Sequence, residues 1–156
     1  GITGGTGTYF MLCALGLMLS RLQGGRSLRE GRLTHHAATG MVVSLVGYTL
    51  FILIPTVAPH QSGLIMVAYY GSALLIGLGN GHLWPAFLNM IIGLAKNSER
   101  GTANSTLLTA WDLGVGLGIV MGGIIAEHLG YTAAFWTVVA VHVAGTAFFL
   151  FITARR

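Results

Sequence analysis

Long apolar runs with almost no charged residues dominate this sequence and restrict what it can fold into. Each run approaches or exceeds the roughly 20 residues that an α-helix needs to cross a bilayer. Charged residues make up only 8% of the chain, against roughly 25% in a soluble domain. The sequence therefore predicts a protein that has lipid as its solvent. The runs occupy residues 6–22, 37–54, 64–92, 102–125 and 132–153.

The apolar runs lack the alternation of apolar and polar residues that transmembrane β-strands show. An open sheet could not satisfy its backbone hydrogen bonds in hydrocarbon, whereas a helix satisfies them internally. We therefore expect an all-α, multi-pass membrane protein with five transmembrane helices, of which the first is the shortest.

Lysine and arginine occur at three places along the chain, which are the first and third connections and the C-terminal end. The second and fourth connections contain neither residue. Because successive helices alternate in direction, the three basic places fall on one side of the membrane. The positive-inside rule predicts that this side, with the C-terminus, is cytoplasmic. The net charge of +4 then reflects topology and anionic lipid headgroups, and we expect no nucleic-acid partner.

Three segments carry recognisable patterns. They are residues 25–32 (GRSLREGR), residues 77–81 (GLGNG) followed by Trp84-Pro85, and residues 100–105 (RGTANS) followed by Asp112-Leu113-Gly114. In this order they resemble the major facilitator superfamily, and within it the drug and metabolite exporters that are coupled to protons. The resemblance extends over nearly the whole chain.

The first of these segments resembles the superfamily's cytoplasmic loop pattern G-x-L-x-D-R-x-G-R. Arg29 and Glu30 stand where that pattern has Asp and Arg. A basic and an acidic residue are kept, and the resemblance implies a cytoplasmic loop motif at this place. Its residues are Gly25, Arg26, Arg29, Glu30 and Arg32.

The glycine series that begins at Gly114 is similar to the exporter motif G-x3-G-P-x2-G-G of the fifth helix, but Ile119 replaces the proline. The third apolar run also lacks the arginine that is typical of the fourth helix. Both departures favour the second half of the superfamily's twelve-helix fold. The resemblance thus implies that residues 1–156 are helices eight to twelve, a partial C-terminal bundle. The chain begins at Gly1 without an initiator methionine, and we expect the missing N-terminal half to be its partner.

Asp112 is the residue most suggestive of function, because it places a carboxylate inside an apolar run. A carboxylate near a helix centre costs about 2.5–3.5 kcal/mol on insertion scales, so such residues usually face a partner or an aqueous path. Thr109 and Ser105 precede Asp112 at helical spacing and extend one polar stripe. Asp112 is a candidate for proton coupling, and the alternative is a hydrogen bond that only holds two helices together.

His82 lies at the same predicted depth as Asp112. Both residues are about 15–17 Å from the cytoplasmic ends of their helices at about 1.5 Å per residue. If their faces meet, the pair could hold or pass a proton. Asn89 lies two turns along from His82 and extends its face. The alternative for His82 is a hydrogen bond to a neighbouring helix without a relay role.

Gly114, Gly118 and Gly122 recur on one helical face, where a neighbouring helix could approach closely. Gly123 lies off this stripe and adds flexibility, and Pro85 predicts a kink in the third run. This face is either a fixed packing surface or, as resemblance to rocking-bundle carriers implies, a sliding one.

The resemblance implies a secondary transporter that works by alternating access, with proton-coupled efflux of a small molecule across a bacterial cytoplasmic membrane. It also implies a cavity lined by the first, third and fourth runs. The alternatives are a non-transporting scaffold or receptor on the same fold and an intramembrane enzyme. The HExxH, GxSxG and paired-acid patterns of such enzymes are absent from the sequence, so we expect no enzymatic activity, cofactor or metal site.

Overall fold

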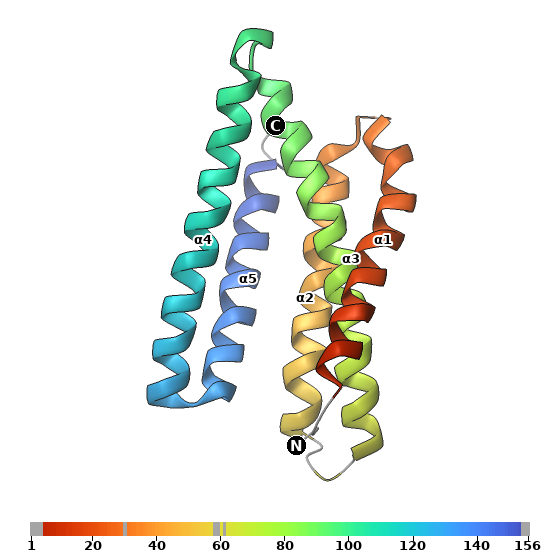
Figure 1. The fold of residues 1–156 in the computed structure, drawn as a ribbon, viewed down its shortest axis with the longest axis vertical. Helices are drawn as coiled ribbons and strands as arrows, with labels where there is room; N and C mark the ends of the chain where they lie inside the picture. Colours follow the sequence, from red (N-terminus) through yellow and green to blue (C-terminus); the bar gives the residue numbers. More distant parts are fainter. Residues whose placement is uncertain (1–4, 30, 58–59, 61, 154–156) are drawn as a thin grey trace.

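The computed structural model describes residues 5–29, 31–57, 60 and 62–153, and the side chains of these residues except 23–29. Within these residues the regular structure is entirely helical, and Figure 1 shows the long helices running side by side. The all-α fold class is therefore confirmed. The helices are α1 (Thr6–Arg29), α2 (Leu33–Val57), α3 (Ser62–Leu94), α4 (Arg100–Leu129) and α5 (Tyr131–Thr153), with a 3-10 turn η1 (Asn97–Glu99) before α4.

Four of the helical segments are long and apolar enough to cross a membrane, and the apolar part of α1, Thr6–Leu22, is shorter. Large apolar side chains are exposed along all five helices, as expected where lipid replaces water around the protein. The chain is an integral, multi-pass membrane protein. The four segments are Leu33–Val57, Ser62–Leu94, Asn97–Leu129 and Tyr131–Thr153.

Helix α3 forms the centre of the packed part, because α1 and α2 both pack on it and hardly touch each other. Small residues bring the backbones together. A Cβ atom built on Gly79 would lie 2.6 Å from the Ser44 backbone nitrogen of α2, and one on Gly77 would collide with the Cys13 carbonyl oxygen of α1. Close backbone packing is how helices associate in lipid, which gives no hydrophobic drive.

The other two helices form a hairpin beside this three-helix bundle (Figure 1). Gly130 has a φ of 85°, and its backbone N–H donates to the Ala126 carbonyl oxygen at 3.1 Å. This left-handed residue closes α4 and lets α5 start at once in the opposite direction. Helix α5 packs on α2, and α4 touches α3 less extensively than it touches α5.

The predicted glycine stripe of α4 is not a contact between helices of this chain. A Cβ atom built on any of its glycines would have no neighbouring atom within 4 Å, and α4 has no buried residue. The close approach occurs instead at Gly77, Gly79 and Gly81 of α3. Close approach of a neighbouring helix to this stripe stays a prediction, for Gly114, Gly118, Gly122 and Gly123.

The α1–α2 connection, the α3–α4 connection and the C-terminal end of α5 lie at one end of the molecule, and the other two connections lie at the opposite end (Figure 1). Arg32, Lys96 and Arg100 therefore lie at the same end of the molecule, which we call the basic end. The alternation of the helices requires this. Arg155 and Arg156 fall outside the described residues.

Candidate functional site

A cavity of about 560 Å³ opens between the α4–α5 hairpin and the three-helix bundle, and we call it the hairpin cavity. The bare faces of Gly114, Gly118 and Gly122 form part of its α4 wall, where glycine leaves the space open. Most other lining residues are apolar, and His142 and Thr146 of α5 add polar groups. Helices α2, α3, α4 and α5 all contribute to the lining. This differs from the expected cavity between the first, third and fourth runs.

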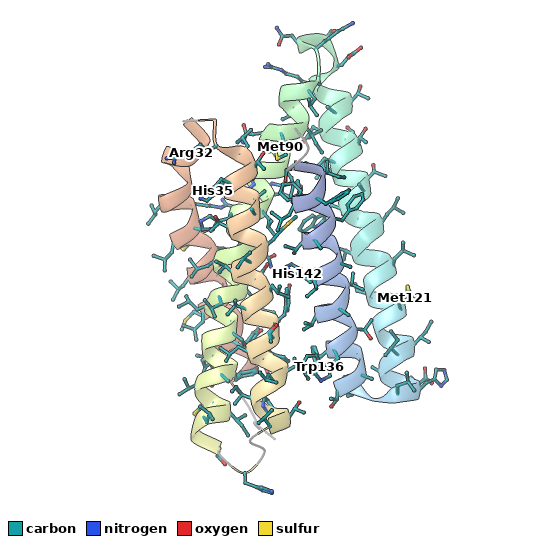
Figure 2. The ribbon with its side chains drawn as sticks, turned by 180° about the vertical axis from the view of Figure 1, so that it is seen from behind. Arg32, His35, Met90, Met121, Trp136 and His142 are labelled. Atoms are coloured by element: carbon teal, nitrogen blue, oxygen red, sulfur yellow. The ribbon has the colours of Figure 1, made fainter. Side chains whose placement is uncertain are left out.

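His142 lies at the seam between α5 and α2, as Figure 2 shows. Its Nε2 atom is 3.0 Å from the Met41 carbonyl oxygen and 3.1 Å from the Ser44 hydroxyl. A carbonyl oxygen only accepts, so Nε2 carries the hydrogen in this bond. The ring also packs edge-on against Tyr48 at a centroid distance of 5.5 Å. His142 thus links two helices and lines the hairpin cavity.

No site role was predicted for His142 from the sequence. The available signal was a histidine in the middle of an apolar run, which needs a partner for its polar nitrogens. The sequence does not show which helix faces contact each other, so this partner could not be identified from it.

His82 is buried in α3 and hydrogen-bonds to its own helix. Its Nδ1 atom is 2.7 Å from the Leu78 carbonyl oxygen. Its ring lies 4.5 Å from the ring of His36 on α2, centroid to centroid, with a 44° angle between the planes. His36 is also buried, and its Nε2 atom has no hydrogen-bond partner. The neighbour of His82 is therefore a second histidine.

Asp112 is exposed on α4 and makes no hydrogen bond or ion pair with any residue that the structure describes. The contact of α4 with α3 at this level is made by Trp111, whose ring meets Trp84 edge-on at a centroid distance of 5.2 Å. One residue along a helix turns the side chain by about 100°, so Asp112 points elsewhere. The predicted pair with His82 is absent because equal depth does not imply a shared face.

The other polar candidates hydrogen-bond to their own helices. Asn89 donates to the Pro85 carbonyl oxygen at 2.7 Å, and Ser105 donates to that of Gly101 at 3.1 Å. Thr109 donates to the Ser105 carbonyl oxygen at 2.9 Å. Such local bonds satisfy hydroxyl and amide groups within an apolar setting. All three side chains are exposed and remain available to a partner or to water.

Most of the predicted loop motif lies outside the described side chains. This applies to Gly25, Arg26 and Arg29, and to Glu30, which the structure does not describe at all. Arg32 is exposed directly before α2 and lies near His35 at the basic end (Figure 2). The assignment of this loop motif stays a prediction. The described residues also hold no group of three or more His, Cys, Asp or Glu side chains that could bind a metal ion.

Comparison with known proteins agrees with these features. A family model described as the Major Facilitator Superfamily matches residues 3–156. An MFS-type transporter of Aspergillus terreus (strain NIH 2624 / FGSC A1156) is 26% identical over 124 residues, which cover 79% of this chain and 21% of the relative. The chain thus spans about a fifth of the length of that curated relative. No solved structure matches the chain. Because the family model covers nearly every residue, the chain belongs to the Major Facilitator Superfamily.

Proposed function

We propose that this chain forms part of a secondary transporter that exports a small molecule by alternating access, coupled to proton entry. The hairpin cavity is the observation that carries this proposal. Its volume falls in the range of about 300–1,000 Å³ that small-molecule sites occupy. Its mostly apolar lining, with a few polar groups, suits an amphipathic solute rather than a strongly charged one.

Alternating access needs two helix groups that can move against each other around a binding site. The α4–α5 hairpin is the group that we propose to move. It has far fewer contacts with the bundle than the bundle helices have with each other, and no residue of α4 is buried. The α4 glycine face, which lines the hairpin cavity, would let the hairpin move against the bundle, and Pro85 would act as a hinge in α3.

Asp112 is our candidate for the coupling carboxylate. It is an exposed acid in the middle of a membrane-spanning helix, and an acid at such a position costs about 2.5–3.5 kcal/mol unless it faces water or a partner. We propose that it faces the aqueous path, with Thr109 and Ser105 along the same stripe. We also propose that the chain corresponds to helices eight to twelve of the twelve-helix fold, with its basic end in the cytoplasm.

Transport by the intact protein in everted membrane vesicles tests this function. An imposed proton gradient should drive accumulation of fluorescent amphipathic dyes, with ethidium and Hoechst 33342 as probes. Asp112→Asn should abolish this uptake while the protein remains in the membrane. Glu127→Gln is the control, because it neutralises an exposed acid at the far end of the same helix. Absence of gradient-driven dye movement in the unmodified protein would refute the proposal.

A further inference from the structure

The polar groups on the α5 wall of the hairpin cavity can accept hydrogen bonds more readily than they can donate them. Among the described residues that line the cavity, none is an Asp, Glu, Lys or Arg. The Thr137 hydroxyl donates its hydrogen to the Ala133 carbonyl oxygen at 2.9 Å, and the Thr146 hydroxyl donates to the His142 carbonyl oxygen at 2.8 Å. A hydroxyl that has used its hydrogen can only accept further hydrogen bonds. Both threonines are therefore left with acceptor capacity alone.

The contacts of His142 with α2 determine which of its ring nitrogens carries a hydrogen. Its Nε2 atom lies 3.0 Å from the Met41 carbonyl oxygen, which can only accept. Nε2 also lies 3.1 Å from the Ser44 hydroxyl, whose own hydrogen is directed to the Gly40 or the Met41 carbonyl oxygen, at 2.9 and 3.1 Å. Both neighbours thus require a hydrogen on Nε2. In the neutral ring, Nδ1 then carries a lone pair and no hydrogen.

Nδ1 of His142 makes no hydrogen bond with any residue that the structure describes. It is also accessible, because the buried side-chain nitrogen without a partner in the described residues is Nε2 of His36. The two nitrogens of the ring point in different directions, so Nδ1 faces away from the contact with α2, and the ring lines the hairpin cavity. An accessible lone pair in an apolar setting gains a hydrogen bond from a solute that brings a donor.

Tyr48 is the polar residue that packs directly against this ring. The two rings meet edge-on at a centroid distance of 5.5 Å, and Tyr48 lines the same cavity. Its hydroxyl makes no hydrogen bond within the described part of the chain and can either donate or accept. Tyr48 therefore supplies an adaptable group beside the fixed acceptor of His142.

We infer that Nδ1 of His142 presents its lone pair to the hairpin cavity and selects amphipathic solutes that carry an N–H or O–H group. An analogue whose donor is blocked leaves the lone pair unpaired, which is how a polar site discriminates against such a molecule. The consequence for export rests on the proposed function.

Binding of two matched probes to the intact purified protein in detergent tests this inference. The first, 7-amino-4-methylcoumarin, carries an N–H donor group, and in 7-dimethylamino-4-methylcoumarin methyl groups replace both of those hydrogens. Both probes are uncharged, so they differ in the donor and not in charge. Quenching of tryptophan fluorescence at about pH 8, where a histidine ring is neutral, gives the two dissociation constants. The measured quantity is the ratio of the dimethylamino constant to the amino constant, in which partition into the detergent cancels when protein variants are compared.

His142→Phe keeps a ring beside Tyr48 but removes the acceptor, and should lower this ratio by roughly 2- to 10-fold, the equivalent of one hydrogen bond. His35→Phe is the matched control and should leave the ratio unchanged, because His35 is exposed at the basic end and does not line the cavity (Figure 2). Thr137→Val removes the exposed hydroxyl acceptor of the α5 wall and should lower the ratio less than His142→Phe. A variant that misfolds is recognised by its unfolding transition in SDS, and His142→Leu then replaces His142→Phe.

An unchanged ratio in His142→Phe would overturn the inference. A fall in Thr137→Val as large as that in His142→Phe would also overturn it, because the hydroxyl would then act as the acceptor. An unmodified protein that binds neither probe would reject the proposed class of solute.

Dye transport by the same variants separates this inference from the proposed function. A ratio that depends on His142, in a protein that moves no dye, would reject the transporter proposal but leave the inference. Gradient-driven dye transport together with an unchanged ratio in His142→Phe would reject the inference but leave the transporter proposal.

Discussion

The contact between α2 and α3 at Gly79 gives a direct prediction about stability. A Cβ atom at this position would lie 2.6 Å from the Ser44 backbone nitrogen and 2.7 Å from the Gly40 carbonyl oxygen. Both neighbours are backbone atoms, so rotation of a side chain cannot relieve the clash and the two helices must separate. We predict that Gly79→Ala destabilises the folded protein.

The size of the effect follows from two opposing terms. Overpacking a close contact costs about 1–3 kcal/mol, and replacing glycine by alanine inside a helix gains about 1 kcal/mol. Because the new Cβ meets two backbone atoms, its cost should lie in the upper part of this range, about 2–3 kcal/mol. The free energy of unfolding should then fall by roughly 1–2 kcal/mol. Gly71→Ala is the control in the same helix, because a Cβ atom there meets only Leu50 Cδ2 at 3.8 Å. This control should be neutral or more stable by up to about 1 kcal/mol.

Unfolding by SDS in mixed micelles, monitored by tryptophan fluorescence, measures the stability of both variants. The midpoint SDS fraction should drop for Gly79→Ala and stay constant or rise for Gly71→Ala. Equal midpoints for Gly79→Ala and the unmodified protein would refute the close backbone packing of α2 on α3. An equal fall of the midpoint in the two variants would show that the replacement of glycine by alanine lowers the stability by itself. The contact between α2 and α3 would then not be the cause.

Three further experiments, with four substitutions, test the contacts and the cavity around the α4–α5 hairpin. His142→Phe keeps a ring against Tyr48 but removes the hydrogen bond to α2, and should cost about 0.5–1.5 kcal/mol in the same titration; an unchanged midpoint would contradict the link. Trp111→Ala and Trp84→Ala should be non-additive by about 0.5–1.5 kcal/mol in a double-mutant cycle, whereas strict additivity would argue against their contact. Gly118→Leu would place a side chain in the hairpin cavity and should strongly reduce dye transport at normal membrane levels, and undiminished transport would remove the cavity from the substrate path.

The uncharged runs predicted the helices well, because length and the absence of charge decide whether a segment can cross a bilayer. The runs at 64–92 and 132–153 lie within α3 and α5, whose observed ends extend them by a few residues at most. The sequence also predicted which connections lie at the same end of the molecule, because successive helices alternate in direction. These features depend on the order of residues along the chain and not on which helix faces which.

Lateral neighbours were not predictable in the same way. A membrane helix is apolar around its whole circumference, so the sequence gives little indication of its buried face. The glycine-rich stretches of α3 and α4 look alike in the sequence. Only Gly77, Gly79 and Gly81 of α3, however, lie against the backbone of another helix in this chain. The shared depth of His82 and Asp112 gave no information on how each helix is rotated about its axis. The predicted contact between them is therefore missing, and His82 contacts His36 instead. His36 stands at the end of a polar connection, so the sequence gave no reason to expect it in a buried contact.

Labelling of single cysteines from either side of the membrane tests the threading on which the whole account depends. Cys13 is first replaced by serine, and a cysteine is then placed at Thr34, His60, Ser98 or His128, one exposed position in or beside each connection. We predict that membrane-impermeant maleimide reaches positions 34 and 98 from the cytoplasmic side and positions 60 and 128 from the opposite side. Labelling of positions 60 and 98 from the same side would contradict the arrangement and the transporter mechanism built on it.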